Sequence, residues 1–256
     1  MTAAEANARD VAGRHIVVTG ASSGIGRATA ILLAKRGARV SLVARRAEAL
    51  EAVWRAAGGN SFAVSADVSD RPALLVALDS AEAVFGPIDG LFANAGTGGA
   101  FAPFVDYSTE IFETVLRTNL LSPFWAMQHV LPGMIERRHG AILVTGSLAS
   151  ERGMAHNPGY VASKHGVLGL ARAAAIEAAP HNVRVNCIVP GFIETEMLAN
   201  LGEDALAAMQ ARTPQGRTGT AEELAEVAAF LLSDAAAHVT GQSWAVDGGI
   251  LNTLTV

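Results

Sequence analysis

The stretch His15-Ile-Val-Val-Thr-Gly-Ala-Ser-Ser-Gly-Ile-Gly26 decides the fold of this 256-residue chain. His15–Thr19 is a short β-branched run that predicts a strand, and Arg27–Arg36 predicts a helix that Gly37 ends. Glycines between a strand and a helix let the backbone approach a diphosphate, and the helix N-terminus offers N–H donors and a positive dipole end. A tight connection without a ligand is the alternative. The position after the first strand favours a dinucleotide site.

Strands and helices alternate along the rest of the chain. Further strands are predicted at Arg39–Val43, Ser61–Ser65, Ile88–Ala93, Ala141–Thr145, Arg184–Val189 and Trp244–Val246. Further helices are predicted at Arg46–Ala57, from Ser69 or Asp70 to Phe85, at Thr109–Val130 with Pro123 loosening or kinking it, at Gly159–Ala179, at Glu194–Arg212, and from a Thr220 cap to Ser233. The strands are continuous apolar runs, which is typical of a parallel sheet covered on both faces.

This pattern predicts an α/β fold, a doubly wound sheet of about seven parallel strands with helices on both faces. We expect residues 14–256 to form one domain and residues 1–13 to be a mobile N-terminal extension. Function in such a sheet belongs at the carboxyl ends of the strands.

The composition narrows the functional class. Half of the residues are hydrophobic, 17% are charged and the net charge is −5, with no basic block, so nucleic-acid binding is not expected. The first 13 residues lack the apolar core of a signal peptide, and no apolar run reaches the length of a membrane span. We therefore expect a cytoplasmic protein without membrane contact. The single cysteine, Cys187, lies in an apolar strand and is expected to be an inert core thiol.

A tyrosine and a lysine stand four residues apart in Pro158-Gly-Tyr-Val-Ala-Ser-Lys164. On a helix this spacing places Tyr160 and Lys164 on one face. An ammonium beside a phenol favours the phenolate and makes the phenol a usable proton donor near neutral pH. Because such pairs often only cover a surface, the catalytic hypothesis depends on the residues around them.

Together these segments resemble the short-chain dehydrogenase/reductase family over nearly the whole chain. The family's T-G-x-x-x-G-x-G motif is matched by Thr19, Gly20, Gly24 and Gly26. Its N-N-A-G motif is present as Ala93-Asn94-Ala95-Gly96, so the first asparagine is missing. The resemblance implies a Rossmann-fold oxidoreductase that transfers a hydride between a nicotinamide cofactor and a ketone or secondary alcohol.

The resemblance also implies a catalytic tetrad of Asn119, Ser147, Tyr160 and Lys164. In that scheme Tyr160 exchanges a proton with the substrate oxygen, and Lys164 supports it and hydrogen-bonds the nicotinamide ribose. Ser147 donates to the substrate oxygen, and Asn119 holds a water that connects Lys164 to solvent. The alternatives are a turn role for Ser147 and a buried structural role for Asn119. No metal is implied, and the sequence shows no His/Cys/Asp cluster with ligand spacing.

The expected cofactor contacts come from the glycine-rich turn and the strand ends. Asp67-Val68 resembles the family's adenine-contacting pair, although Asp67 could instead cap the next helix. Asn94 is expected beside the adenosine ribose, or else as a left-handed turn residue. The segment from Pro190 to Thr195 resembles the one that closes over the nicotinamide. The full set is Gly20, Ser22, Ser23, Gly24, Ile25, Gly26, Arg45, Arg46, Asp67, Val68, Asn94, Ala95, Gly96, Tyr160, Lys164, Pro190, Gly191, Ile193 and Thr195.

The residues after the second predicted strand favour NADP(H) over NAD(H). Relatives that prefer NAD usually carry an acidic residue at the position of Ala44. Arg45 stands where NADP-preferring relatives have a basic residue, and a guanidinium matches a 2′-phosphate bidentately. The alternative is that Arg45 and Arg46 are solvated residues at a helix start.

The substrate is predicted only as a hydrophobic ketone or secondary alcohol, from mostly apolar walls at Ala149, Met154, His156, Phe192 and Met197, where His156 is either a polar handle or an exposed loop residue. One alternative is reduction of 3-ketoacyl groups on acyl carrier protein, for which Arg138 matches one basic carrier-binding position and His181 replaces the second. The other is a non-catalytic NAD(P)-sensing protein, which the intact tetrad disfavours. The resemblance implies a homotetramer or homodimer, paired through the long helices.

Overall fold

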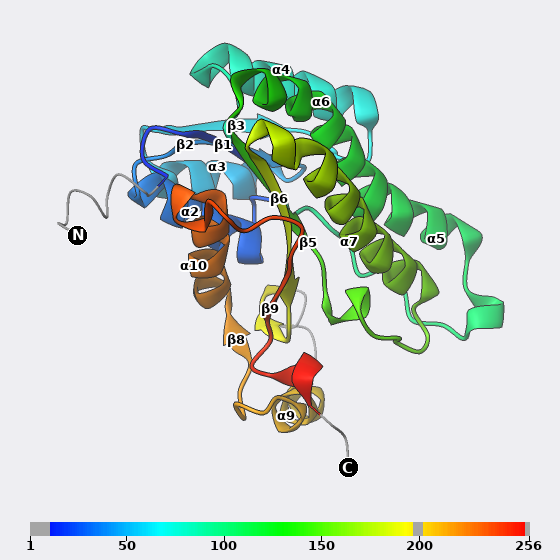
Figure 1. Ribbon diagram of the computed structural model, residues 1–256. Coiled ribbons are helices and arrows are strands. Elements are labelled where there is room, and N and C mark those ends of the chain that lie inside the picture. The colour runs from blue at the N-terminus through cyan, green and yellow to red at the C-terminus, as the bar shows by residue number, and fades with distance from the viewer. Residues whose placement is uncertain (1–10, 197–201, 254–256) are drawn as a thin grey trace.

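The structure is a computed structural model that describes residues 11–196 and 202–253, and Figure 1 shows it as a ribbon. A seven-stranded parallel sheet has the order β3-β2-β1-β4-β5-β6-β9. Its strands are β1 His15–Thr19, β2 Arg39–Ala44, β3 Ser61–Ser65, β4 Gly90–Ala93, β5 Gly140–Thr145, β6 Val183–Pro190 and β9 Ser243–Val246. The predicted doubly wound sheet is therefore confirmed.

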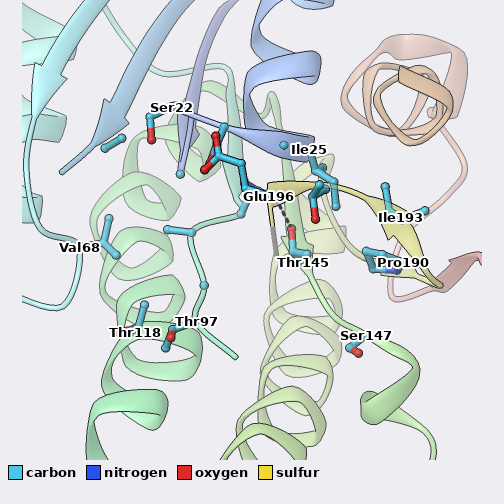
Figure 2. Close-up of a pocket in the computed structure, with 18 of the residues that line it drawn as sticks. Ser22, Ile25, Val68, Thr97, Thr118, Thr145, Ser147, Pro190, Ile193 and Glu196 are labelled. Atoms are coloured by element: carbon cyan, nitrogen blue, oxygen red, sulfur yellow. Dashed lines mark hydrogen bonds between the residues drawn. The ribbon is translucent and has the colours of Figure 1, made fainter. Parts of the chain in front are cut away.

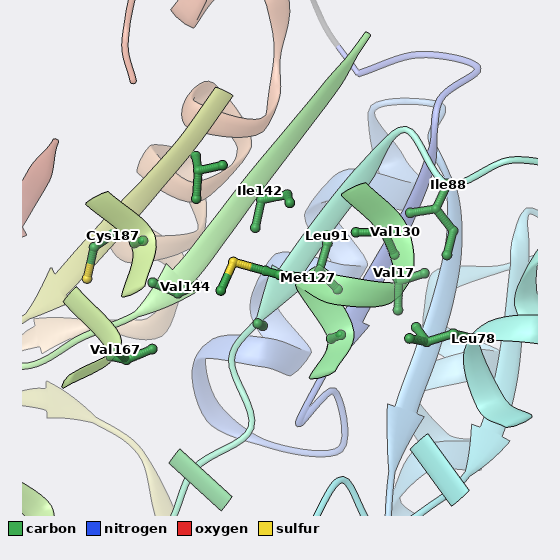
Figure 3. Packing of buried hydrophobic residues seen from close by; sticks show 14 of the residues in the cluster. Val17, Leu78, Ile88, Leu91, Met127, Val130, Ile142, Val144, Val167 and Cys187 are labelled. Carbon is green, nitrogen blue, oxygen red and sulfur yellow. The ribbon is translucent and has the colours of Figure 1, made fainter. Parts of the chain in front are cut away.

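Helices cover both faces of this sheet (Figure 1). On one face lie α2 Gly24–Lys35, α3 Ala47–Ala57 and α10 Ala221–Leu232; on the other lie α4 Arg71–Phe85, α5 Thr109–Leu116, α6 Ser122–Arg137 and α7 Pro158–Ala178. Neighbouring residues of β1 point to opposite faces, so Ile16 packs with α2 and α10 while Val17 packs with α4 and α6. Figure 3 shows Val17, Leu78 and Met127 in the second of these two cores.

The helix predicted at Thr109–Val130 differs from the observed one. α5 passes into α6 through a π-helical segment at Arg117–Leu121, which ends two residues before Pro123. Because proline has no N–H, the carbonyl four residues earlier cannot receive its α-helical bond, and the wider turn accommodates that loss. Beyond Val130 the helix continues through Pro132 and ends at Arg137, and the C-cap residue Arg138 adopts the left-handed conformation.

Other differences lie at element ends. α2 begins at Gly24, inside the glycine-rich turn, rather than at Arg27. The helix predicted from Glu194 is wrong at its start, because Ile193–Glu194 forms β7 and pairs with β8, Gly219–Thr220. α9 spans only Glu203–Arg212. At α10 the predicted cap is confirmed: Thr220 and Glu223 form a reciprocal capping box.

Residues 1–10 of the expected N-terminal extension lie outside the described residues. Within the extension, Val11 is buried and the Gly13 amide donates a hydrogen bond to the Gly37 carbonyl at 2.8 Å. Cys187 is fully buried in β6, as expected of a core thiol, and burial raises the pKa of its thiol to about 12, which disfavours the reactive thiolate at neutral pH. Among the described residues, no helix is both long and apolar enough to span a membrane.

Candidate cofactor and catalytic site

A cavity of about 390 Å³ opens at the carboxyl ends of the central strands (Figure 2). Each residue predicted to contact the cofactor lines it, apart from Gly26. Ser147 and Phe192 line it as well. The fold thus brings to one place residues that are up to 176 positions apart in the chain, from Gly20 to Glu196.

The glycine-rich turn forms one wall of this cavity. Gly20 has φ +68°, and a Cβ there would lie 2.8 Å from the backbone Cα of Ala95. Gly26 lies behind the wall, where a Cβ would meet the Gly20 carbonyl oxygen at 2.3 Å, so this glycine serves close packing rather than ligand contact. Ser23, the N-cap of α2, makes no side-chain cap bond, which leaves the first-turn N–H groups available to an anion.

Asn94, which follows β4, links the carboxyl ends of β1, β4 and β5 through hydrogen bonds. Its Nδ2 donates to the Thr19 carbonyl at 3.2 Å, and its Oδ1 accepts from Thr145 Oγ1 at 3.1 Å. Thr19 Oγ1 in turn accepts the amides of Asn94 and Ala95. Asn94 is not in the left-handed region, so the alternative of a left-handed turn residue is wrong.

Two arginines and two carboxylates stand at the end of the cavity where the sequence analysis expects the adenosine. Arg45 Nη1 lies 3.6 Å from Asp67 Oδ2, and Arg46 Nη1 lies 3.0 Å from Glu196 Oε2. Asp67 Oδ1 accepts from the amide and hydroxyl of Ser69, so Asp67 organises a turn. It is Asp70 that occupies the N-cap position of α4.

Opposing influences act on the Asp67 carboxyl. Partial burial acts to raise its pKa, but the Ser69 amide and hydroxyl and the Arg45 guanidinium together hold the pKa below its ordinary value. Asp67 is therefore a carboxylate at neutral pH, and it remains able to accept a further hydrogen bond.

Tyr160 and Lys164 project from the first turns of α7 into the cavity. Lys164 is buried, and its Nζ donates to the Thr145 carbonyl at 2.7 Å. The same Nζ lies 5.6 Å from the centroid of the Tyr160 ring. Ser147, two residues beyond Thr145, accepts the Ala149 amide through Oγ, and this leaves its own hydrogen for an oxygen in the cavity.

Asn119 lies behind the cavity wall, in the π-helical segment, and is buried. Its Oδ1 accepts the Thr97 amide at 2.8 Å, and its Nδ2 donates to the Thr97 carbonyl at 2.9 Å and to Ser163 Oγ at 3.2 Å. A Cβ placed on Gly96 would lie 3.3 Å from Asn119 Oδ1 and 3.8 Å from Lys164 Nζ. Asn119 and Lys164 therefore flank the same backbone position.

The residues predicted to form the substrate wall have different placements. Phe192 lines the cavity, whereas Ala149 is buried in a short 3-10 turn and does not. Met154 and His156 lie in an exposed loop and do not line it either, because the chain swings outward between Ser147 and α7. Met197 lies outside the described residues.

Sequence reasoning missed several residues of this site, among them Thr97, Thr118, Thr145 and Gly146, which line the cavity. Glu196 lines the cavity but follows the motif segment, and only the fold brings it to Arg46. Asn157 is the N-cap of α7: its Oδ1 accepts the Tyr160 amide at 3.3 Å and thereby fixes the turn that carries Tyr160. An asparagine directly before Pro158 is a readable N-cap signal.

The sequence shows no metal-ligand spacing, but the fold brings three potential ligands together. Asp79 and Glu82 on α4 meet His129 on α6, and their ligand atoms lie within 4.8 Å of one another. None of the three lines the cavity. His129 Nε2 lies 3.4 Å from Asp79 Oδ1, a contact that serves as a surface ion pair when the imidazole is protonated.

A family model described as enoyl-(acyl carrier protein) reductase matches residues 20–251. The chain belongs to the short-chain dehydrogenase/reductase family. It is 41% identical over 238 residues to the cis-4-hydroxycyclohexanecarboxylate dehydrogenase of Sinomonas cyclohexanicum, a match covering 92% of this chain and 96% of that protein. It is 37% identical over 238 residues to the 3-oxoacyl-(acyl-carrier-protein) reductase of Escherichia coli, covering 93% and 97%.

The short-chain dehydrogenase/reductase fold also matches in three dimensions. The crystal structure of levodione reductase superposes with a TM-score of 0.92 at 36% identity, and the match covers 95% of this chain and 99% of that one. As a short-chain dehydrogenase/reductase, the chain is an oxidoreductase that uses a nicotinamide cofactor and acts on CH–OH and C=O groups.

Proposed function

We propose that this short-chain dehydrogenase/reductase interconverts a secondary alcohol and a ketone with NADP(H), and that Tyr160 is the general acid and base. The observation that carries the proposal is the buried Lys164 ammonium, held by the Thr145 carbonyl beside the Tyr160 ring in the cavity that the glycine-rich turn lines. The nicotinamide, when bound, supplies or accepts the hydride.

Tyr160 gives a proton to the substrate oxygen during reduction and takes one during oxidation. The Lys164 charge, 5.6 Å from the ring centroid, stabilises the phenolate that remains after donation. Burial makes this interaction stronger than it would be in water, since little solvent screens it. The Thr145 bond holds the ammonium at that distance.

Ser147 acts as a donor to the substrate oxygen. Its Oγ already accepts the Ala149 amide, so its hydrogen is free to point into the cavity. A fixed donor aimed at the reacting oxygen stabilises negative charge as that charge develops. Asn119 acts as a positioning residue, because it holds Thr97 and Ser163, and Ser163 Oγ donates to the Tyr160 carbonyl at 2.8 Å. We keep its water-holding role as a proposal.

Three features of the cavity support NADP(H) as the cofactor. The free first-turn amides of α2 suit a diphosphate. Position 44 carries an alanine and therefore no carboxylate for the ribose hydroxyls. Arg45 and Arg46 both line the cavity next to that alanine, and guanidinium groups match a 2′-phosphate.

The cofactor proposal is tested by kcat/KM with NADP and NAD on the same alcohol. We expect NADP to be preferred, and Arg45→Ala to lower kcat/KM for NADP by about tenfold while that for NAD changes little. Lys35→Ala, which removes a positive charge at the far end of α2, is the matched control. A preference for NAD in the unmodified enzyme would sink the proposal.

For the substrate we propose a secondary alcohol on a six-membered carbon ring, or the corresponding ketone. The support is the likeness to a hydroxycyclohexanecarboxylate dehydrogenase and the apolar side chain of Phe192 in the cavity wall. A panel of cyclohexanol, 4-hydroxycyclohexanecarboxylate and linear 2-alkanols tests it, and faster oxidation of the linear alcohols would contradict it.

Reduction of 3-ketoacyl thioesters is the second candidate, because of the likeness to the reductase of Escherichia coli. Arg138 Nη2 donates to the carbonyl of Pro180, the residue before His181, at 3.1 Å. Within one chain, however, Arg138 and His181 lie where β5 and β6 begin, at the end of the sheet opposite to the cavity. An assay with acetoacetyl thioesters separates the two candidates. Absence of turnover on every substrate would favour the non-catalytic sensor.

We also propose that the chain assembles as a homodimer or homotetramer through its long helices. Large apolar side chains are exposed on the π-helical segment, on α6 and on α7, among them Leu121, Phe124 and Ile176. Ile176 has 74% of its surface accessible. Sedimentation velocity tests this: a monomer at micromolar concentration would refute the proposal, and Phe124→Glu should shift an oligomer toward smaller species.

A further inference from the structure

Arg46 has a protein partner at the adenosine end of the cavity. Its Nη1 donates to Glu196 Oε2 at 3.0 Å, and its Nη2 lies 3.5 Å from Ser22 Oγ. Arg46 follows β2 and Glu196 follows β7, so the pair joins segments 150 residues apart in the sequence. Both residues line the cavity. The Glu196 carboxylate therefore binds the same guanidinium that an anion in the cavity would bind.

Packing explains how Glu196 reaches this place. Ile193 pairs with Gly219 in the small sheet of β7 and β8, which anchors the segment. Thr195 then rests on the glycine-rich turn, where its Cγ2 would be 3.0 Å from a Cβ on Gly24. Figure 2 shows Glu196 at the same end of the cavity as Ser22. The fixed path of residues 193–195 directs the next side chain toward Arg46.

The charges at this end come in matched pairs. Within the described residues, the acidic side chains that line the cavity are Asp67 and Glu196, and each lies beside one arginine. Asp67 is also held by Ser69, whereas Arg46 is the one polar partner of the Glu196 side chain among the described residues. A 2′-phosphate bound by Arg46 would therefore compete with Glu196 directly, and its negative charge would be repelled by that carboxylate.

We infer that Glu196 is a specificity-determining residue: it competes with the 2′-phosphate for Arg46 and so limits the preference for NADP(H) over NAD(H). The inference rests on the proposed cofactor site. NAD(H) has no 2′-phosphate, so it leaves the pair intact. The side chains of Arg46 and Glu196 are 54% and 66% exposed, so solvent screens the pair and the effect is modest. We expect a change of about fivefold in relative affinity.

The test measures dissociation constants of NADPH and NADH by fluorescence titration for the full chain and four variants. Glu196→Gln removes the carboxylate charge and keeps the shape. Glu194→Gln is the matched control, because it removes the same charge two residues away from Glu196. Glu194 does not line the cavity, and a glutamine in its place can still accept the hydrogen bond from Thr218 Oγ1. Arg46→Gln and the double variant Arg46→Gln/Glu196→Gln complete a cycle.

We expect Glu196→Gln to tighten NADPH about fivefold, to leave NADH within twofold, and to lose this effect in the Arg46→Gln background and at 0.5 M salt. Equal tightening of both cofactors, an unchanged NADPH affinity, or the same effect without Arg46 would overturn the inference. If the unmodified enzyme prefers NADH and Glu196→Gln still shifts the ratio toward NADPH, the NADP(H) proposal fails while this inference stands.

Discussion

Asn119 holds both backbone groups of Thr97, accepting its amide at 2.8 Å and donating to its carbonyl at 2.9 Å. One side chain therefore joins the π-helical segment to the loop that follows β4. Thr97 lines the cavity, so this two-point contact fixes part of its wall. Because Asn119 is buried, removing its side chain would leave the Thr97 amide and carbonyl without these partners.

For this reason Asn119→Ala is expected to lower the free energy of unfolding by about 1–3 kcal/mol and to reduce kcat/KM. Urea unfolding and steady-state rates measure the two effects. Ser163→Ala is the comparison for stability alone, since it removes the 3.2 Å bond to Asn119 and the 2.8 Å bond to the Tyr160 carbonyl but leaves both Thr97 bonds in place. Equal losses of unfolding free energy in the two variants would show that the Thr97 contact is unimportant for stability.

A second prediction concerns Arg184, buried in β6, which caps the end of α10. Its Nη1 and Nη2 donate to the carbonyls of Leu231 and Ser233 at 2.6 and 2.8 Å. Burial lowers the pKa of Arg184 to about 10, so the side chain stays charged at neutral pH. A cation there also complements the negative end of the helix dipole.

Arg184→Met is expected to lower the free energy of unfolding by about 3 kcal/mol, because two carbonyls lose a charged donor in a buried place. Arg184→Lys keeps the charge but lacks the planar guanidinium that reaches both oxygens. We therefore expect it to lower the free energy of unfolding by an intermediate amount. Denaturant titration gives both values. A Met variant as stable as the parent would contradict the capping role.

The buried His15 ring makes the fold sensitive to acid. Its Nδ1 lies 2.8 Å from the Gly86 carbonyl oxygen and its Nε2 lies 2.8 Å from Ser41 Oγ, so a neutral ring satisfies both contacts. Burial is the main cause that lowers the pKa of His15 from 6.5, partly offset by the Gly86 carbonyl. Below pH 6.5 the unfolded chain takes up a proton more readily than the folded one.

The stability contributed by the neutral ring is thus complete above pH 6.5 and declines as the pH falls through the lowered pKa of the folded state. Replacing His15 with Gln removes the titrating group. We expect the difference in unfolding free energy between parent and variant to shrink between pH 7 and pH 5. A difference that is constant with pH would show that His15 titrates alike in both states.

Local sequence predicted much of the fold and site. The glycine-rich turn and the apolar runs placed all seven strands of the main sheet, because such patterns depend on neighbours in the chain. The cap of α10 was readable for the same reason, since Thr220 and Glu223 are three residues apart. Strand ends then brought the predicted cofactor contacts to one cavity, as a parallel sheet requires.

What sequence could not provide depends on tertiary contacts. The pairing of Arg46 with Glu196 joins two segments whose separation only the fold closes. The exposed placement of Met154 and His156 follows from the outward path of a loop, which no periodicity encodes. The π-helical segment was predicted only in part: Pro123 indicated a disturbance of the helix, but the sequence did not show that Asn119 in this segment contacts Thr97.

The central claim is that Tyr160 transfers the proton, and Tyr160→Phe tests it most directly. The variant keeps the ring beside Lys164 and removes only the hydroxyl. The measurement is kcat/KM on the best ring alcohol of the panel, together with the dissociation constant of NADPH. We predict that kcat/KM falls by about 10³ while NADPH binding stays within about twofold. A variant that retains a tenth or more of the parent kcat/KM would contradict the account.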